Sequence, residues 1–222
     1  MLIGSISHSR ELRLRITGGA GGQKRSANKR PLEEELTRKE IRVAGFGGQG
    51  VVLSGQILGK AASIYDGGFA TLSQSYGPEA RGGSCSAEVV ISDEPIGYPY
   101  VTRPQVLIIL SQEAYTKYVH SLAAETLVII DPDLVKPDQS QNPALLSIPC
   151  TRMAREMGRV VVANIIMLGF LAGVRDVVSA EALRKSVLAS VPEGTGEFNL
   201  KAFELGRTYA LGHVGHSEET NG

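Results

Sequence analysis

Four glycines lie within residues 45–50, in the segment IRVAGFGGQG, and they limit the possible folds of this chain more than any other feature. A short apolar run that favours a β-strand precedes them, and a helical pattern of residues follows Gly50. Glycine has no Cβ atom to keep a ligand from the backbone, and the free N–H groups at the start of a helix attract an anion. Gly45, Gly47 and Gly50 also match the pattern G-x-G-x-x-G. The segment therefore predicts a Rossmann-like strand–turn–helix unit that can bind phosphate.

The residues that should hold the ribose of NAD are missing from this unit. In a dinucleotide-binding domain an acidic residue lies about 20 residues beyond the glycines, at the end of the second strand. Here the second apolar run, 69–72, continues into Ser73-Gln74-Ser75, and Asp66 comes before it. The turn is therefore suited to phosphate but not to NAD. A purely structural interpretation also stays open, in which the glycines only let the helix pack tightly on the sheet.

The helix predicted after the turn, residues 50–65, has small residues on one side. Val51, Leu58 and Ala62 recur at helical spacing, and Gly55 and Gly59 lie on the same side. Each glycine costs about 1 kcal/mol relative to alanine inside a helix. We therefore expect close contact between this helix and the sheet to offset that cost.

The overall composition indicates one α/β domain with a balanced charge. The chain has 222 residues, 42% of them hydrophobic, and 23 basic and 23 acidic side chains, so no net charge draws it to nucleic acid or to a membrane. No uninterrupted apolar run reaches the roughly 18 residues that a spanning helix needs. We expect a cytoplasmic protein with a disordered basic leader over 1–38, one domain over 39–211 and a flexible tail over 212–222.

The leader prediction rests on composition. Residues 18–22 are almost all glycine, arginines are scattered around them, and large apolar side chains are few, so ordering this segment has little to offset its entropy. Deleting it should hardly change the melting temperature. A transit peptide and a misassigned start codon both stay open as explanations for its presence.

Cysteine and histidine are too sparse and too scattered to form a metal centre. The chain has two cysteines, Cys85 and Cys150, both among small or apolar neighbours, and four histidines without metal-ligand spacing. We expect the two thiols to be buried and reduced. The chain alone is therefore predicted to hold no metal and no iron–sulfur cluster, and it offers no clear catalytic residue.

Strand and helix signals alternate along the rest of the chain, which predicts a layered α/β sheet. Residues 106–110 and 127–130 are apolar on both faces, as strands covered on both sides should be. Strand 84–92 mixes small and polar residues with apolar ones, so we expect it near an edge and antiparallel. The predicted strands are 41–45, 69–73, 84–92, 105–110, 126–131 and 147–149, and the helices are 50–65, 112–122, 151–157, 160–173, 179–190 and 199–210.

Two further segments suggest functional contacts. Residues 160–174 are almost entirely apolar and predict a buried helix or a partner-facing surface. Asn164 is the exception, and its amide should either clasp a nearby loop or contact a ligand, with the clasp favoured. The segment SYGPEARGG, residues 75–83, follows the second strand and should face the first glycine turn. Within it Arg81 offers a planar fork for phosphate or carboxylate, although an exposed ion pair with Glu79 explains it equally well.

Three segments together resemble a known family. GFGGQGVVLSGQILGKAA, SQSYGPEARGGSCSAEVVISDEPIGYP and VVANIIMLGFLAG occur in order and resemble the gamma subunit of 2-oxoacid:ferredoxin oxidoreductases, particularly the 2-oxoglutarate type. The resemblance covers residues 41–211. It implies a three-layer α/β/α sandwich with a mostly parallel sheet. Related pyruvate, branched-chain 2-oxoacid and indolepyruvate enzymes carry variants of the same motifs.

The resemblance also implies a reaction and a set of partners. A 2-oxoacid, coenzyme A and oxidised ferredoxin would give acyl-CoA, carbon dioxide and reduced ferredoxin. Thiamine diphosphate, magnesium and iron–sulfur clusters would belong to partner chains, namely alpha and thiamine-binding beta subunits and a ferredoxin-like delta subunit. This chain would be inactive alone and would contribute to coenzyme A binding and subunit assembly. The residues implied to border the coenzyme are Gly47, Gly48, Gln49, Gly50, Ser75, Tyr76, Arg81 and Gly82.

Two other functions stay open from the sequence. The chain could be a non-catalytic scaffold whose glycine turns serve folding and whose 160–174 surface docks a catalytic partner. An independent NAD-dependent dehydrogenase is disfavoured by Ser73-Gln74-Ser75 and by the lack of an acid/base pair. Titration of coenzyme A against the purified chain would distinguish a coenzyme-binding gamma subunit from a non-catalytic scaffold.

Overall fold

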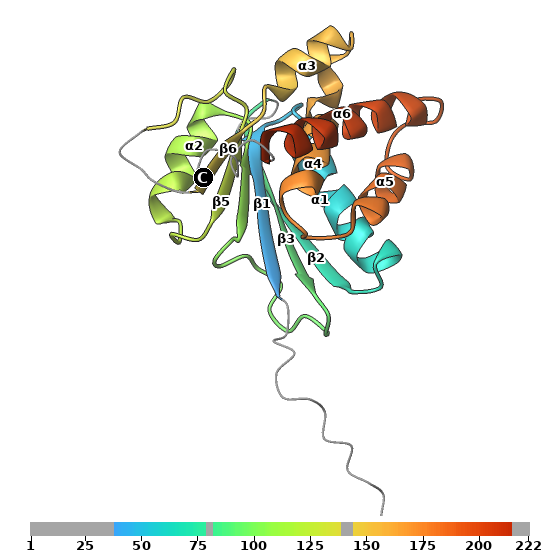
Figure 1. Cartoon of the computed structure of the whole chain (residues 1–222). Helices are drawn as coiled ribbons and strands as arrows, with labels where there is room; N and C mark the ends of the chain where they lie inside the picture. Colours follow the sequence, from blue (N-terminus) through green and yellow to red (C-terminus); the bar gives the residue numbers. More distant parts are fainter. Residues whose placement is uncertain (1–37, 79–81, 139–143, 215–222) are drawn as a thin grey trace, which may run out of the picture. The chain divides into compact units, whose positions relative to one another are not determined.

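A six-stranded sheet is the centre of the part of the chain that the structure describes, residues 38–78, 82–138 and 144–214 of a computed structural model (Figure 1). Residues 1–37 of the predicted leader, Arg81 and most of the C-terminal tail lie outside these ranges, whereas Arg38, predicted as the last leader residue, is described and hydrogen-bonded to the fold. The strands lie in the order β2-β3-β1-β4-β5-β6. Their bounds are β1 (Lys39–Phe46), β2 (Phe69–Tyr76), β3 (Ser84–Ser92), β4 (Val106–Ile109), β5 (Leu127–Ile130) and β6 (Ala144–Ser147).

Three neighbouring pairs in the sheet are parallel and two are antiparallel. β1 pairs with β4, β4 with β5 and β5 with β6 in parallel, whereas β3 runs antiparallel to both β1 and β2. The antiparallel direction predicted for strand 84–92 is therefore confirmed, although the edge itself is β2. Because β3 lies between β1 and β2, the β1–α1–β2 unit differs from a dinucleotide-binding unit, in which the first two strands are neighbours.

Helices cover both faces of this sheet, which confirms the predicted three-layer α/β/α sandwich. Figure 1 shows α2 on one face and α1, α4, α5 and α6 on the other. Side chains alternate accordingly, since Ile41 and Val43 join the larger core cluster with these four helices and Ala44 joins the smaller cluster under α2. The helices are α1 (Val51–Lys60), α2 (Gln112–Tyr118), α3 (Cys150–Glu156), α4 (Ala163–Val174), α5 (Ala180–Leu188) and α6 (Gly196–Val214).

Several predicted helices contain tighter or wider turns at their ends. The predicted helix 50–65 is α1 followed by a π-helical turn, η1 (Ala61–Tyr65), where Asp66 N–H donates to the carbonyl of Ala61 at 3.0 Å. The 3₁₀ turns are η2 (Val119–Ser121) after α2 and η3 (Val160–Val162) before α4. Sequence periodicity of about 3.6 does not distinguish these turns from α-helix, so it predicted longer helices.

Glycine contacts confirm part of the predicted helix packing. A Cβ atom on Gly55 would come within 2.8 Å of Ala87 and Leu72 on the sheet, so this glycine does permit close contact. Gly59 has no atom within 4 Å of that position, and the prediction for it is wrong. The closest helix contact lies elsewhere, between α4 and α6, where a Cβ on Gly169 would overlap the carbonyl of Phe203 and a Cβ on Gly206 that of Ile166.

Candidate functional site

The glycine turn joins the carboxyl end of β1 to the start of α1. Gly48 and Gly50 have left-handed φ values of 94° and 75°, which glycine adopts without strain. Gly50 is the N-cap of α1, and no side chain caps the helix there. The first N–H groups of an α-helix have no acceptor within the helix and carry its positive dipole end. The turn thus has the uncapped helix start and the left-handed glycines expected of an anion site, and binding of an anion there stays a prediction.

The glycines of the turn have different neighbours. A Cβ on Gly47 would lie 3.3 Å from the backbone nitrogen of Gly82, and a Cβ on Gly50 would overlap the amide of Asn164. These two glycines permit close packing within the protein. Gly48 has no atom within 4 Å of its Cβ position. Gly48 is therefore the glycine of the turn whose open side is available to a ligand.

Gln49 ties two strand ends together. Its Oε1 accepts a hydrogen bond from the backbone N–H of Phe46 at 2.6 Å, and its Nε2 donates to the carbonyl of Leu110 at 2.7 Å. The side chain therefore links the end of β1 to the end of β4 and fixes the shape of the turn. A contact between Gln49 and a cofactor stays a prediction.

The second glycine loop lies against the first, as the sequence predicted. The N–H of Gly47 donates to the carbonyl of Gly83 at 2.8 Å, and Gly82 has a left-handed φ of 69°. The loop closes through the N–H of Gly77, which donates to the carbonyl of Ser84 at 2.6 Å. Arg81 lies outside the described residues, so its role as an anion ligand stays a prediction.

Ser75 and Tyr76 line a different recess from the glycine turn. They sit at the end of β2 and border a small cavity of about 50 Å³ together with Ser86, Lys117 and Tyr118. The Tyr76 side chain is 66% exposed, and its hydroxyl donates to Oε1 of Gln74 at 2.7 Å. A contact of these two residues with the same ligand as Gly48 stays a prediction, and it would need a ligand that extends across the start of β3.

A cavity of about 400 Å³ opens beside Gly48. One wall is the glycine turn, the second is the loop after β5, and the third is formed by α3 and η3. Its remaining lining is a mixture of apolar and polar side chains from Leu110, Leu134, Thr151, Arg155, Val160, Val161 and Ala163. Concave, mostly apolar sites with a few polar groups are the usual form of small-molecule sites in proteins.

Arg155 is the cation of this cavity, and the sequence analysis did not identify it. Its guanidinium forms no hydrogen bond or salt bridge with a described residue, whereas Arg152 on the same helix pairs with Asp133. Arg155 also lies close enough to Asp133 to contribute to lowering the pKa of that carboxyl, after the larger effect of the Arg152 hydrogen bond. No local motif marks Arg155, because only the fold brings α3 beside the turn.

Asn164, at the start of α4, holds the glycine turn through a hydrogen bond. Its Nδ2 donates to the carbonyl of Gly50 at 3.3 Å, and the residue is buried at the start of α4. The predicted clasp of a nearby loop is confirmed.

Cys150 and Asp131 form a buried pair at the start of α3. The Cys150 Sγ donates to Oδ2 of Asp131 at 3.1 Å. Burial, and then the negative charge of Asp131, raise the pKa of the Cys150 thiol well above its ordinary value. Burial likewise raises the pKa of Cys85. Both cysteines are free and buried, as predicted, and their protonated thiols are poor nucleophiles.

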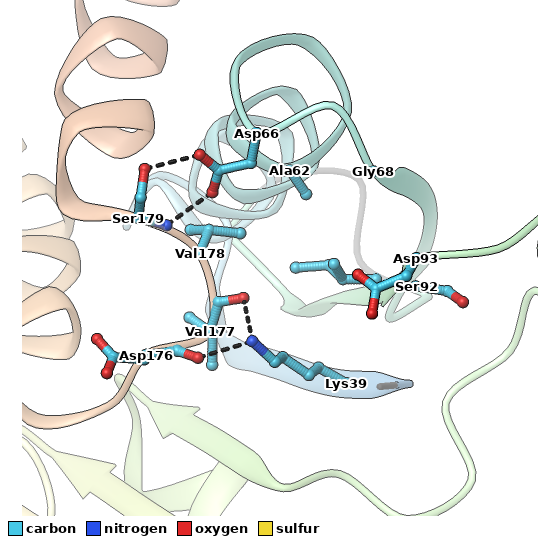
Figure 2. A pocket seen from close by; sticks show the side chains of 11 residues that line it. Lys39, Ala62, Asp66, Gly68, Ser92, Asp93, Asp176, Val177, Val178 and Ser179 are labelled. Atoms are coloured by element: carbon cyan, nitrogen blue, oxygen red, sulfur yellow. Dashed lines mark hydrogen bonds between the residues drawn. The ribbon is translucent and has the colours of Figure 1, made fainter. Parts of the chain in front are cut away.

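A second cavity, of about 340 Å³, lies at the opposite end of β1 and is shown in Figure 2. Its charged groups contact the protein itself. Lys39 Nζ donates to the carbonyls of Asp176 and Val177 at 2.8 and 3.2 Å, and the two carboxylate oxygens of Asp66 accept from the hydroxyl and the N–H of Ser179, both at 2.7 Å. These bonds fasten the segment between α4 and α5 to the start of β1 and to the turn after η1.

The described ranges contain no cluster of metal-ligating side chains and no helix that could span a membrane. No three side chains of His, Cys, Asp or Glu there come close enough together to hold a metal ion. None of the helices in these ranges has the length and hydropathy needed to cross a bilayer.

Comparison with known proteins places this fold in one family. Residues 40–209 match the model of the pyruvate ferredoxin/flavodoxin oxidoreductase family. The 2-oxoglutarate synthase subunit KorC of Methanocaldococcus jannaschii is 51% identical over 172 residues, which cover 76% of this chain and 92% of the relative.

Two solved structures have the same fold. The keto/oxoacid ferredoxin oxidoreductase gamma subunit of Geobacter sulfurreducens has a TM-score of 0.72 and 44% identity, and the match covers 79% of this chain and 98% of that one. The 2-oxoglutarate:ferredoxin oxidoreductase of Magnetococcus marinus, solved with 2-oxoglutarate, coenzyme A and succinyl-CoA bound, has a TM-score of 0.71 and 26% identity over 78% of this chain and 31% of that one. This chain belongs to the pyruvate ferredoxin/flavodoxin oxidoreductase family.

Proposed function

We propose that this chain is the gamma subunit of a 2-oxoglutarate:ferredoxin oxidoreductase. The reaction converts 2-oxoglutarate, coenzyme A and two oxidised ferredoxins into succinyl-CoA, carbon dioxide and two reduced ferredoxins. Similarity to the 2-oxoglutarate synthase subunit supports both the subunit and the substrate. The match covers 92% of that relative, so the similarity extends over nearly its whole length.

Redox and decarboxylation chemistry in this reaction has to come from partner chains. Thiamine diphosphate supplies an electron sink for the carbanion, and iron–sulfur clusters carry single electrons to ferredoxin. The two cysteines of the whole chain cannot supply the four thiolates of a cluster, and both are buried and apart in the structure. We assign the cluster and the thiamine diphosphate with its magnesium to alpha, beta and ferredoxin-like delta partners.

The cavity beside Gly48 suits part of coenzyme A. A phosphate group can lie at the start of α1, where the free N–H groups and the open side of Gly48 allow backbone contact. Arg155, which lines the same cavity, can neutralise that phosphate. The apolar side chains of Leu110 and Leu134 can contact the pantetheine portion. The main support for this proposal is that an open glycine turn, an arginine without a salt-bridge partner among the described residues and an apolar wall surround the same cavity.

An exposed apolar pair at the rim of the cavity supports assembly with a partner. Val160 and Val161 in η3 are 50% and 72% exposed, while the rest of the apolar segment is largely buried in α4. The predicted partner-facing surface is thereby reduced to these two residues, and the remainder of 160–174 is the predicted buried helix. We propose that a partner chain covers η3 and closes the cavity from outside. A cytoplasmic location stays a prediction.

Reconstitution tests this function. The purified chain, free of iron and thiamine, should not reduce ferredoxin or a viologen dye with 2-oxoglutarate and coenzyme A. Activity should appear when the thiamine-binding and ferredoxin-like partners are added. Reduction by the chain alone would show that the subunit assignment is wrong. Activity of the complex with pyruvate or 3-methyl-2-oxobutanoate but not with 2-oxoglutarate would retain the subunit assignment and overturn the substrate.

A further inference from the structure

A buried carboxylate connects two walls of the cavity. Asp131 follows β5 directly and is 0% exposed. It forms no salt bridge with a described residue, so its charge is balanced by hydrogen-bond donors instead. A buried carboxylate is tolerated only when its oxygens are well supplied with such donors. The positions of these donors therefore depend on Asp131, and they lie on two separate segments.

One carboxylate oxygen holds α3. Oδ2 of Asp131 accepts from the backbone N–H of Thr151 at 2.8 Å and from the Cys150 thiol at 3.1 Å. The N-cap position of α3 is Pro149, which provides no side-chain cap. Asp131 thus does the work of a capping residue from another part of the chain. Thr151 and Arg155, which line the cavity, both lie on this short helix.

The other oxygen and the main chain hold the loop after β5. Oδ1 of Asp131 accepts from the N–H of Asp133 at 2.9 Å, and the Asp131 carbonyl accepts from the N–H groups of Leu134 and Val135 at 3.0 and 2.9 Å. Leu134 forms the second wall of the cavity. A single residue therefore fixes both the loop and the helix that face each other across the space beside Gly48.

We propose that Asp131 is a positioning residue for coenzyme A, acting through Thr151, Arg155 and Leu134 without touching the ligand. This rests on the proposed function of the cavity. Asparagine at this position has one acceptor oxygen, so it can serve Thr151 N–H or Asp133 N–H but not both. One side-chain hydrogen bond to a wall is then lost, while the main-chain bonds to Leu134 and Val135 and the volume of the side chain are preserved. A misplacement of about 1 Å can lower the efficiency of a site by up to 100-fold.

The test is steady-state kinetics of the reconstituted complex. With Asp131→Asn, the KM for coenzyme A should rise about tenfold, a value within the range expected for a small displacement. The KM for 2-oxoglutarate and kcat at saturating coenzyme A should stay unchanged, because that substrate and the thiamine are held by partners. A merely structural role would lower the amount of active complex and hence kcat, and would leave the KM for coenzyme A unaltered.

Controls separate this inference from the proposed function. Cys150→Ser keeps a donor to Oδ2 and should leave the KM for coenzyme A unaltered. Gly48→Val places a side chain in the cavity and so tests whether the cavity is the coenzyme site. If Gly48→Val raises the KM for coenzyme A and Asp131→Asn does not, the positioning role is overturned and the site stands. If neither variant changes it, the cavity is not the coenzyme site and both proposals fail. Should Asp131→Asn not assemble, Asp131→Ser must show the same selective rise in KM.

Discussion

The two ends of strand β1 use their polar groups in opposite ways. At the amino end, Arg38 donates to the carbonyls of Tyr98 and Tyr100, and Lys39 donates to two carbonyls of the segment before α5. Glu40 is 4% exposed and accepts from the N–H groups of Thr102 and Arg103 at 2.6 and 2.7 Å. These side chains fasten neighbouring loops to the sheet.

At the carboxyl end the polar groups surround an open space. Gly48 has an empty side, α1 starts without a side-chain cap, and Arg155 has no salt-bridge partner among the described residues. Polar groups that are satisfied within the fold contribute to stability, whereas groups directed into a cavity remain for a ligand. The contrast indicates that substitutions at the amino end should change unfolding free energy and those at the carboxyl end should change ligand affinity.

Glu40→Ala should have the largest effect and should act on stability alone. It leaves the N–H groups of Thr102 and Arg103 without their acceptor and Arg38 without its salt bridge at 2.8 Å. Breaking a fully buried charged pair by removing one partner costs about 3–5 kcal/mol, and the 34% exposure of the Arg38 side chain places this substitution at the lower end of that range. Denaturant unfolding of the purified chain measures this cost, with the exposed Glu94→Ala as the control. An unchanged unfolding free energy, or a raised KM for coenzyme A, would contradict the assignment of the amino end of β1 to stability alone.

Gly48→Val should reverse that pattern. The left-handed φ of 94° strains a residue with a side chain by about 1–2 kcal/mol, and the side chain would project into the cavity. Loss of backbone contact should raise the KM for coenzyme A by about 100-fold, as for a displaced ligand. Gly194→Val is the matched control, since Gly194 also has a left-handed φ, of 78°, and an open Cβ position. It should show the strain without the change in KM.

Arg155→Ala should weaken coenzyme A binding without changing stability. Loss of a hydrogen bond to a charged group costs about 1.5–3 kcal/mol of binding free energy. Calorimetric titration of coenzyme A into the complex measures it. Arg152→Ala is the control, because Arg152 lies on the same helix and is exposed like Arg155 but is paired with Asp133, so its loss should be worth about 0–1 kcal/mol. Equal effects of the two variants would mean that Arg155 acts only through surface charge.

The smallest effect should be a change of stability with pH at the amino end. Burial alone would raise the pKa of Glu40, but the N–H groups of Arg103 and Thr102 and the Arg38 guanidinium outweigh it and hold that pKa below its ordinary value. A lowered folded-state pKa gives stability that is complete above the unfolded value of about 4.3 and is lost as the pH falls through the folded value. The stability difference between wild type and Glu40→Ala should therefore be constant near pH 7 and shrink below about pH 4. A difference that grows on acidification would contradict this account.

The sequence predicted the layers of the fold and the glycine turn because both depend on local patterns. Short apolar runs mark the strands, and small residues recur at helical spacing after the glycine turn. Asn164 is recognisable as one polar residue in an apolar run. Arg155 and Asp131 could not be predicted in this way. Each gains its role only when α3 lies beside the ends of β1 and β5, and an isolated Arg or Asp has no local signature of that contact. The same applies to Gln49, whose amide donates to the carbonyl of Leu110, 61 residues further along the chain.

The crossing of α4 and α6 affects how precisely the glycine turn beside the cavity is positioned. Gly169 and Gly206 bring the two helix backbones into direct contact, and no side chain lies between them that could adopt another rotamer. Direct backbone contact with α6 therefore fixes the position of α4. Asn164, in the first turn of α4, is fixed with it and holds Gly50 through its hydrogen bond. The precision of the glycine turn is thus set partly by α6, an element that lines none of the cavity beside Gly48.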